Sequence, residues 1–298
     1  MASRNARPLL GGIEAGGTKF VLAVGHSPQE IVARETIPTT TPDVTMATTA
    51  KWFSQHGPLV ALGIASFGPV ELDRASPRWG HITDTPKPGW AQTDVVGPLG
   101  RALACPVGFD TDVNGAALAE NAFGAGAGDG SLAYITVGTG IGGGLVLDGR
   151  PVHGAGHPEL GHMFVRRDGE DFDFPGICPF HGDCVEGLAS GPAIKARWGK
   201  TLSELPADHP AHTYVAGYLA QLCHTTFATV AVDTIVLGGG VMQTPGLIER
   251  VRERTFAIGA EYLPGRSRQE VVAPGLGQDS GICGALILAE RAFEGETD

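Results

Sequence analysis

Two stretches of the chain share a pattern in which short apolar runs flank glycine-rich turns. Residues 9–25 read LLGGIEAGGTKFVLAVG, and residues 132–149 read LAYITVGTGIGGGLVLDG. Apolar and β-branched residues bounded by glycines are typical of strands, so each stretch predicts a β-hairpin. The repetition indicates two similarly built halves. The bare amides of such turns suit an anionic phosphate, because no side chain blocks its approach.

Predicted strands and helices alternate through the segment between the two hairpins. Asp112 stands at the end of one strand, just before a helix that stops at Gly124. That position fits a helix N-cap, and it also fits a general base that accepts a proton from a hydroxyl. The predicted elements are strands over 30–39, 59–72 and 106–112 and helices over about 45–56, 89–104 and 114–124.

Two other phosphate-binding motifs do not fit these turns. Gly138, Gly140 and Gly143 satisfy GxGxxG, but a dinucleotide fingerprint must open a helix, and the strand-like LVLDGRP follows here. A Walker A loop is excluded at the first turn because Thr18 separates glycine from lysine. Two ordinary hairpins without a ligand remain the alternative.

Composition narrows the classes of partner. The chain has 298 residues, which fits two domains, and a net charge of −11, which argues against nucleic acid as a partner. Its apolar runs are too short for a signal peptide or a membrane span, so we expect a cytoplasmic protein with no membrane partner. Five cysteines do not make a secreted disulfide framework, and Cys105, Cys223 and Cys283 are expected to be buried core thiols.

A cluster of cysteines and histidines lies in the second half of the chain. Cys178, His181 and Cys184 follow a Cys-x2-His-x2-Cys spacing, and His162 lies sixteen residues upstream. Four such ligands bind zinc tetrahedrally and leave no open position for catalysis, so we interpret the cluster as a structural zinc site.

This zinc interpretation has alternatives. A Cys178–Cys184 disulfide and uncoordinated surface residues are two of them. His153 and His157 compete with His162 for the fourth ligand position on composition alone.

Eight motifs follow one another along the chain: IEAGGTK, SFGPV, TPKPGW, TDVNGAALAE, VGTGIGGG, HPELGHM, the Cys/His cluster ending in CVE, and IVLGGGVM. Their order resembles that of the ROK family (repressors, open reading frames and kinases), and most of all its bacterial fructokinase branch. The resemblance covers about residues 11–288. It implies an α/β, actin-like, ribonuclease H-like two-domain sugar kinase with an interdomain cleft. The domains would be a smaller one over 1–113, joined by the C-terminal helix at about 284–298, and a larger one over 114–283 with the zinc loop.

The resemblance also implies roles for particular residues. Asp112 would be the catalytic base and a sugar contact, and Glu159, His162 and Glu186 would face the sugar, with His162 also ligating zinc. The first phosphate turn would comprise Glu14, Gly16, Gly17, Thr18 and Lys19. The second phosphate turn would comprise Gly138, Thr139, Gly140 and Gly142, and Gly238, Gly239 and Gly240 would lie against the adenosine.

The chain departs from the family pattern at two places. Glucokinases of the family usually have Asn immediately before the catalytic aspartate, where this chain has Thr111. The usual three-cysteine zinc motif is a Cys-His-Cys version here. Both departures resemble fructokinases.

We therefore expect ATP- and Mg²⁺-dependent phosphorylation of D-fructose to fructose 6-phosphate by a homodimer with structural Zn²⁺. The alternatives are a ROK hexokinase that prefers mannose, glucose or N-acetylmannosamine, and a non-catalytic sugar-binding relative. A ROK repressor would need an N-terminal helix-turn-helix, and only about eight residues precede the first predicted strand.

Overall fold

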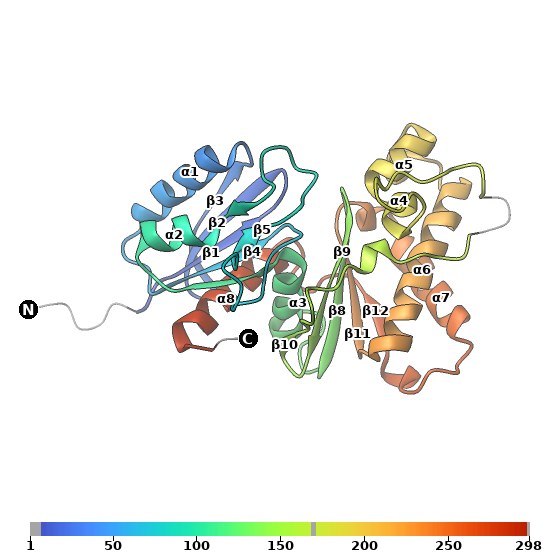
Figure 1. The fold of residues 1–298 in the computed structure, drawn as a ribbon. Coiled ribbons are helices and arrows are strands. Elements are labelled where there is room, and N and C mark those ends of the chain that lie inside the picture. The colour runs from blue at the N-terminus through green and yellow to red at the C-terminus, as the bar shows by residue number, and fades with distance from the viewer. Residues whose placement is uncertain (1–6, 168–170, 297–298) are drawn as a thin grey trace, which may run out of the picture. The chain divides into compact units, whose positions relative to one another are not determined.

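The computed structural model describes residues 7–167 and 171–296, and these form two compact units (Figure 1). Unit 1 contains the described residues up to 119 together with 150–157 and 278–296. Unit 2 contains 120–149 and the described part of 158–277. Residues 150–157 pack with unit 1, which no local pattern in the sequence indicated.

A five-stranded mixed sheet forms the centre of unit 1. The first predicted hairpin is present as the antiparallel pair β1–β2, and β4 and β7 extend the sheet in parallel with β1. Buried Phe20, Leu22 and Ile64 contribute to its core. The strand order is β3 (Glu30–Pro38), β2 (Lys19–Ser27), β1 (Leu10–Ala15), β4 (Ala61–Ser66) and β7 (Val107–Thr111).

Helix α8 (Ser280–Glu294) packs directly onto this sheet. Glycines on two strands allow the close approach: a Cβ on Gly63 would lie 1.8 Å from Ala285 O, and one on Gly108 would lie 2.2 Å from Leu288 O. No side chain fits there without moving the helix. Helices α1 (Pro42–Ser54) and α2 (Val96–Leu103) also belong to unit 1.

The helix predicted over 89–104 is wrong in its first half. Trp90 is fully buried and its Nε1 donates a hydrogen bond to Thr40 O at 2.7 Å, which draws the segment into a turn. The chain then forms the short strand β6 (Thr93–Asp94), paired with β5 (His81–Ile82). The helix begins only after Asp94, whose Oδ1 accepts a hydrogen bond from Gly97 N at 2.7 Å.

Unit 2 is built on the second sheet, which contains the second predicted hairpin, β8 (Ser131–Val137) and β9 (Ile141–Leu147). Strands β11 (Thr234–Gly238) and β12 (Glu270–Val272) extend it in parallel with β8, so the order within unit 2 is β9, β8, β11 and β12. The two-residue strand β10 (Arg150–Pro151) belongs to the segment 150–157 of unit 1. A strand, not a helix, follows the GxGxxG glycines, so the dinucleotide fingerprint is excluded.

The helices of unit 2 are dominated by α6 (Pro210–Val230), which packs against α7 (Leu247–Gly259) (Figure 1). Helices α4 (Val185–Ala189) and α5 (Gly191–Trp198) precede them. The short 3₁₀ helices are η1 (Leu160–His162), η2 (Leu202–Glu204), η3 (Val241–Gln243) and η4 (Arg266–Arg268). None of the helices in the described ranges combines the length and apolar character that a membrane crossing requires.

The sequence predicts that Cys105, Cys223 and Cys283 are buried core thiols. All five cysteines are free; Cys223 and Cys283 are buried as predicted, whereas Cys105 is only half-buried.

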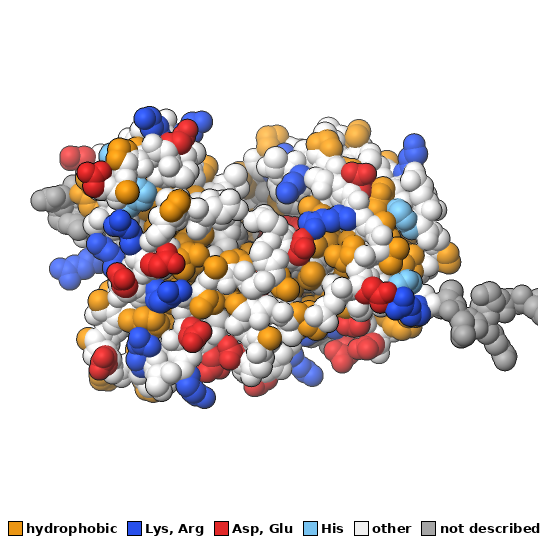
Figure 2. Space-filling model, turned by 180° about the vertical axis from the view of Figure 1, so that it is seen from behind, with side chains coloured by type: hydrophobic (Ala, Val, Ile, Leu, Met, Phe, Trp, Pro, Cys, Tyr) orange, Lys and Arg blue, Asp and Glu red, His pale blue; other side chains and the backbone are white. Residues whose placement is uncertain are grey.

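On the face shown in Figure 2, acidic and basic side chains are interspersed. That face therefore shows no broad area of a single charge among the described residues.

Candidate active site and metal-binding cluster

The first glycine turn joins β1 to β2 in unit 1. Gly16 N donates a hydrogen bond to Lys19 O at 2.9 Å, which closes the turn. Thr39 fixes it from the side, because its Oγ1 donates to Gly16 O at 2.7 Å and its N donates to Thr18 O at 2.9 Å. A Cβ on Gly17 would meet no atom within 4 Å. No atom of unit 1 therefore blocks the approach of a ligand to the backbone of Gly17.

Glu14 lies on β1, immediately before this turn, and faces the start of α8. A Cβ on Gly281 would lie 2.5 Å from Glu14 Cδ, so only glycine lets the helix approach this carboxyl group so closely. Burial raises the pKa of Glu14, and the positive charges of Lys19 and Arg34 partly oppose that rise. The structure therefore places Glu14 between the first turn and the N-terminus of α8.

Asp112 is the first residue of α3 (Asp112–Phe123), directly after β7. The N-cap interpretation of Asp112 is wrong, because Thr111 Oγ1 accepts the hydrogen bond from Asn114 N, at 3.1 Å. Asp112 Oδ1 accepts a hydrogen bond from Val113 N at 2.9 Å. Its carboxyl group therefore lies at the N-terminus of α3, a position where acidic side chains are favoured, and a carboxylate there can serve as a general base.

The second glycine turn lies between β8 and β9 in unit 2. Gly138 N donates to Gly140 O at 2.8 Å, and Gly138 O accepts a hydrogen bond from Gly191 N at 2.8 Å. Ile141 N, at the end of the turn, donates to Glu186 Oε2 at 2.9 Å. The structure therefore brings Glu186 to the second glycine turn, a contact that the sequence did not reveal.

Gly238 ends β11, whose neighbour in the sheet is β8, and Gly239 and Gly240 follow it. Gly239 has a φ of 91°, and a Cβ there would lie 2.4 Å from Val137 O at the end of β8. Glycine is therefore required at this position. The second turn and these glycines lie side by side within unit 2.

Glu120, which the sequence analysis did not assign, supports this region. Its fully buried carboxylate accepts hydrogen bonds from Ala125 N at 2.8 Å, Gly275 N at 2.9 Å and Leu276 N at 3.0 Å. The loop that it holds approaches the glycines, because a Cβ on Gly238 would lie 3.4 Å from Pro274 Cγ. The sequence signal that could have identified Glu120 is an acidic residue near the end of a largely apolar helix.

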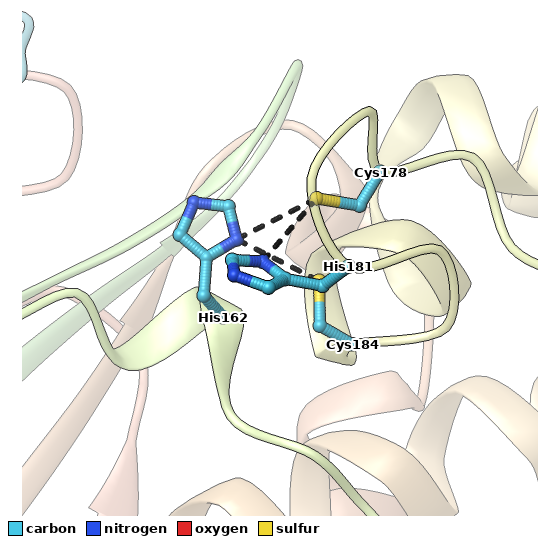
Figure 3. A group of neighbouring side chains, drawn as sticks. All are labelled: His162, Cys178, His181 and Cys184. Atoms are coloured by element: carbon cyan, nitrogen blue, oxygen red, sulfur yellow. Dashed lines mark hydrogen bonds between the residues drawn. The ribbon is translucent and has the colours of Figure 1, made fainter.

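The predicted metal ligands converge in unit 2. His162 comes from η1, and Cys178, His181 and Cys184 come from the loop that precedes α4; their side chains point toward one another (Figure 3). Their candidate ligand atoms all lie within 4.8 Å of one another. Cys178 and Cys184 are free thiols, so the disulfide alternative is wrong. His153 and His157 are not members of this cluster.

The spacing of the cluster suits a tetrahedral ion. Cys178 Sγ lies 3.8 Å from His162 Nδ1 and 3.7 Å from His181 Nδ1, and Cys184 Sγ lies 3.6 Å from His162 Nδ1. Metal bonds of about 2.0–2.3 Å separate tetrahedral ligands by about 3.3–3.8 Å. Two thiolates and two imidazoles are a donor set that zinc accepts.

Protons compete with a metal at this cluster. Burial, with a smaller contribution from the Cys178 thiol, raises the pKa of Cys184 to about 11, while hydrogen bonds from backbone N–H groups partly oppose the rise. The thiol is therefore protonated at neutral pH unless a cation displaces its proton. Metal affinity should accordingly fall as the pH falls.

His162 offers its two ring nitrogens to different surroundings. Nδ1 faces the cysteines, whereas Nε2 lies 4.0 Å from Glu159 Oε2. One imidazole can therefore ligate a metal and present its other nitrogen beside Glu159. This geometry is compatible with the dual role that the sequence resemblance implies.

The candidate residues are divided between the two units. Unit 1 contains the first turn, Glu14 and Asp112. Unit 2 contains the second turn, the glycines after β11, Glu159, Glu186 and the Cys/His cluster.

Comparisons with known proteins agree over nearly the whole chain. The ROK family model matches residues 10–292. A fructokinase from Zymomonas mobilis subsp. mobilis is 49% identical, and the alignment covers 97% of this chain and 99% of the relative. The ROK hexokinase from Thermus thermophilus has a TM-score of 0.80 and 25% identity, with coverage of 96% and 99%.

A ROK family glucokinase from Streptomyces griseus, in complex with glucose and AMPPNP, shares the fold as well. Its TM-score is 0.76 at 24% identity, and the match covers 95% of this chain and 99% of that chain.

Proposed function

We propose that this chain, which belongs to the ROK family, catalyses ATP-dependent phosphorylation of D-fructose to fructose 6-phosphate. The observation that carries the proposal is the 49% identity to a fructokinase over 97% of the chain. The fold supports it, because the chain shares the actin-like architecture of ROK sugar kinases. The chain is therefore an ATP-dependent sugar kinase.

The candidate residues have different roles in phosphoryl transfer. Asp112 takes the proton from the sugar's primary hydroxyl as that oxygen attacks the γ-phosphate. The two glycine turns offer backbone amides to the phosphates, and Gly238, Gly239 and Gly240 lie against the adenosine. Mg²⁺ bound with ATP supplies neutralisation of the phosphate charge.

Sugar recognition falls to Asp112, Glu159, His162 and Glu186. Thr111 in place of the asparagine that ROK glucokinases usually carry supports fructose over glucose. The Cys/His cluster takes Zn²⁺ in a structural role, because four protein ligands leave no coordination position for substrate.

We also propose a location and an oligomeric state for the enzyme. We place the enzyme in the cytoplasm as a homodimer that has hexose and ATP as its small-molecule partners. Sedimentation or light scattering would test the dimer, with a mass of twice 30.8 kDa expected.

Product analysis tests the reaction directly. Incubation of the enzyme with fructose, ATP and Mg²⁺ should give fructose 6-phosphate and ADP, as followed by ³¹P NMR. A phosphate on another fructose hydroxyl, or hydrolysis of ATP without a phosphosugar, would contradict the proposed reaction.

Two substitutions of Glu186 separate its contact with Ile141 from its proposed contact with the sugar. Glu186→Gln keeps an amide oxygen that can accept from Ile141 N, so the KM for ATP should stay within about twofold, whereas Glu186→Ala loses this contact. If the carboxylate also binds the sugar, both variants should raise the KM for fructose by about tenfold or more. Steady-state kinetics with each substrate varied will tell these effects apart. A KM for fructose unchanged in both variants would remove Glu186 from the sugar site.

A further inference from the structure

The segment 150–157 contains two histidines, His153 and His157, that take no part in the metal-binding cluster. Both make contacts inside unit 1. His157 Nε2 accepts a hydrogen bond from Val70 N at 3.2 Å, and His153 Nε2 lies 3.0 Å from Asp110 Oδ2. The segment is therefore fixed at two points.

Asp110 is the centre of a small polar network at the end of β7. Its side chain is almost fully buried, and Oδ1 accepts hydrogen bonds from Thr111 N and Asn114 Nδ2, each at 2.7 Å. His153 approaches the other carboxylate oxygen. The carboxylate thus joins the end of the strand, the first turn of α3 and the segment 150–157.

The contacts determine which atoms donate. Nε2 of His153 must carry a proton, because a lone pair there would face the Asp110 carboxylate. Asn114 Nδ2 lies 3.3 Å from the same ring nitrogen, so both groups donate to the carboxylate and not to each other. A flipped Asn114 amide would bring two oxygens together, which makes the present orientation the favourable one.

Asp112 lies between the residues that this network holds. Thr111 is fixed by its N–H bond to Asp110, and Thr111 Oγ1 in turn accepts from Asn114 N. The orientation of the first turn of α3, and with it the carboxylate of Asp112, therefore depends on a buried acid for which His153 is a partner. A shift of about 1 Å at a reacting group can cost about 100-fold in rate.

We propose that His153 is a positioning residue that acts through Asp110 and Asn114 to hold Asp112 in its reactive orientation. The proposal rests on the proposed role of Asp112 as base. His153 touches neither the transferred phosphate nor the sugar in this account. Its contribution should therefore appear in kcat and not in ATP binding.

Kinetics of three substitutions test the proposal. His153→Ala should lower kcat by about 10- to 100-fold with the KM for ATP within about twofold of wild type. His153→Gln places an amide N–H near the position of Nε2 and should restore kcat to within about threefold of wild type. His26→Ala is the matched control in unit 1: Nδ1 of His26 is hydrogen-bonded to the backbone oxygen of Pro8, and His26 is not part of the Asp110 network, so this variant should match wild type.

A double variant separates positioning from a merely structural role. If His153 acts through Asp112, Asp112→Ala/His153→Ala should be no slower than Asp112→Ala alone, whereas independent effects would multiply. Thermal melting of His153→Ala shows whether that variant is folded, and His153→Gln, which keeps the hydrogen bond, tests the proposal if the alanine variant is not.

Two outcomes would overturn the proposal. A His153→Ala enzyme with wild-type kcat, beside an inactive Asp112→Ala enzyme, would remove the role of His153 and leave Asp112 as base. Equal loss of kcat in the alanine and glutamine variants would also contradict it. Near-normal kcat in Asp112→Ala would instead show that the proposed base itself is wrong.

Discussion

Replacement of Asp112 by alanine is expected to lower kcat by about 100- to 10,000-fold, the usual contribution of a general base. The carboxylate lies at the N-terminus of α3, directly after β7. Steady-state turnover of fructose and ATP measures the loss. Binding of fructose, followed by calorimetry, should persist because Glu159, His162 and Glu186 remain.

Asp112→Asn is the matched control for shape. Its amide oxygen can still accept the hydrogen bond from Val113 N, but it cannot take a proton from the sugar. We expect kcat in this variant to be as low as in the alanine variant. A near-normal kcat in either variant would remove Asp112 from the role of base.

Replacement of Cys178 by serine is expected to release the bound metal and to lower the thermal stability. A hydroxyl is a poor substitute for a thiolate as a zinc ligand, and structural zinc contributes about 10–16 kcal/mol of apparent binding free energy in small peptides. Each kcal/mol lost lowers the Tm by about 2–4 °C in a domain of 150–250 residues. Elemental analysis and thermal melting measure the two effects.

Cys105→Ser is the control for this experiment, because Cys105 is half-buried and lies outside the cluster. It should keep its zinc. Since the pKa of Cys184 is raised to about 11, protons should displace the metal from the wild type as the pH falls. Unchanged zinc content in Cys178→Ser would contradict the zinc proposal.

The sequence predicted the two glycine hairpins because their signal is local. Apolar and β-branched residues flank each turn, and no distant contact is needed to form the pair. The 89–104 helix was wrong because burial of Trp90 and its hydrogen bond to Thr40 override the local pattern. Tertiary contacts decide the structure of that segment.

The metal-binding cluster was predictable from the residue types and their spacing, and the four side chains do converge. The contacts by which carboxylates hold the loops around the second glycine turn could not be predicted. Glu120 reaches Gly275 across 155 residues, and Glu186 reaches Ile141 across 45. A carboxylate that holds a distant loop leaves no periodic signal in one sequence.

The alternative of a non-catalytic relative receives no support from the folded chain. The residues proposed for phosphoryl transfer are present, and both glycine turns are closed by hydrogen bonds within their own units. Only turnover distinguishes a kinase from a sugar-binding relative that retains the same residues.

The most direct test of the central claim is the kcat/KM for fructose, glucose, mannose and N-acetylmannosamine, measured with ATP and Mg²⁺. Fructose should lead by at least about tenfold, or about 1.4 kcal/mol of transition-state discrimination. A lead of the same size by another hexose would contradict the assignment of fructose, and failure to phosphorylate any of the four would contradict the assignment as a sugar kinase.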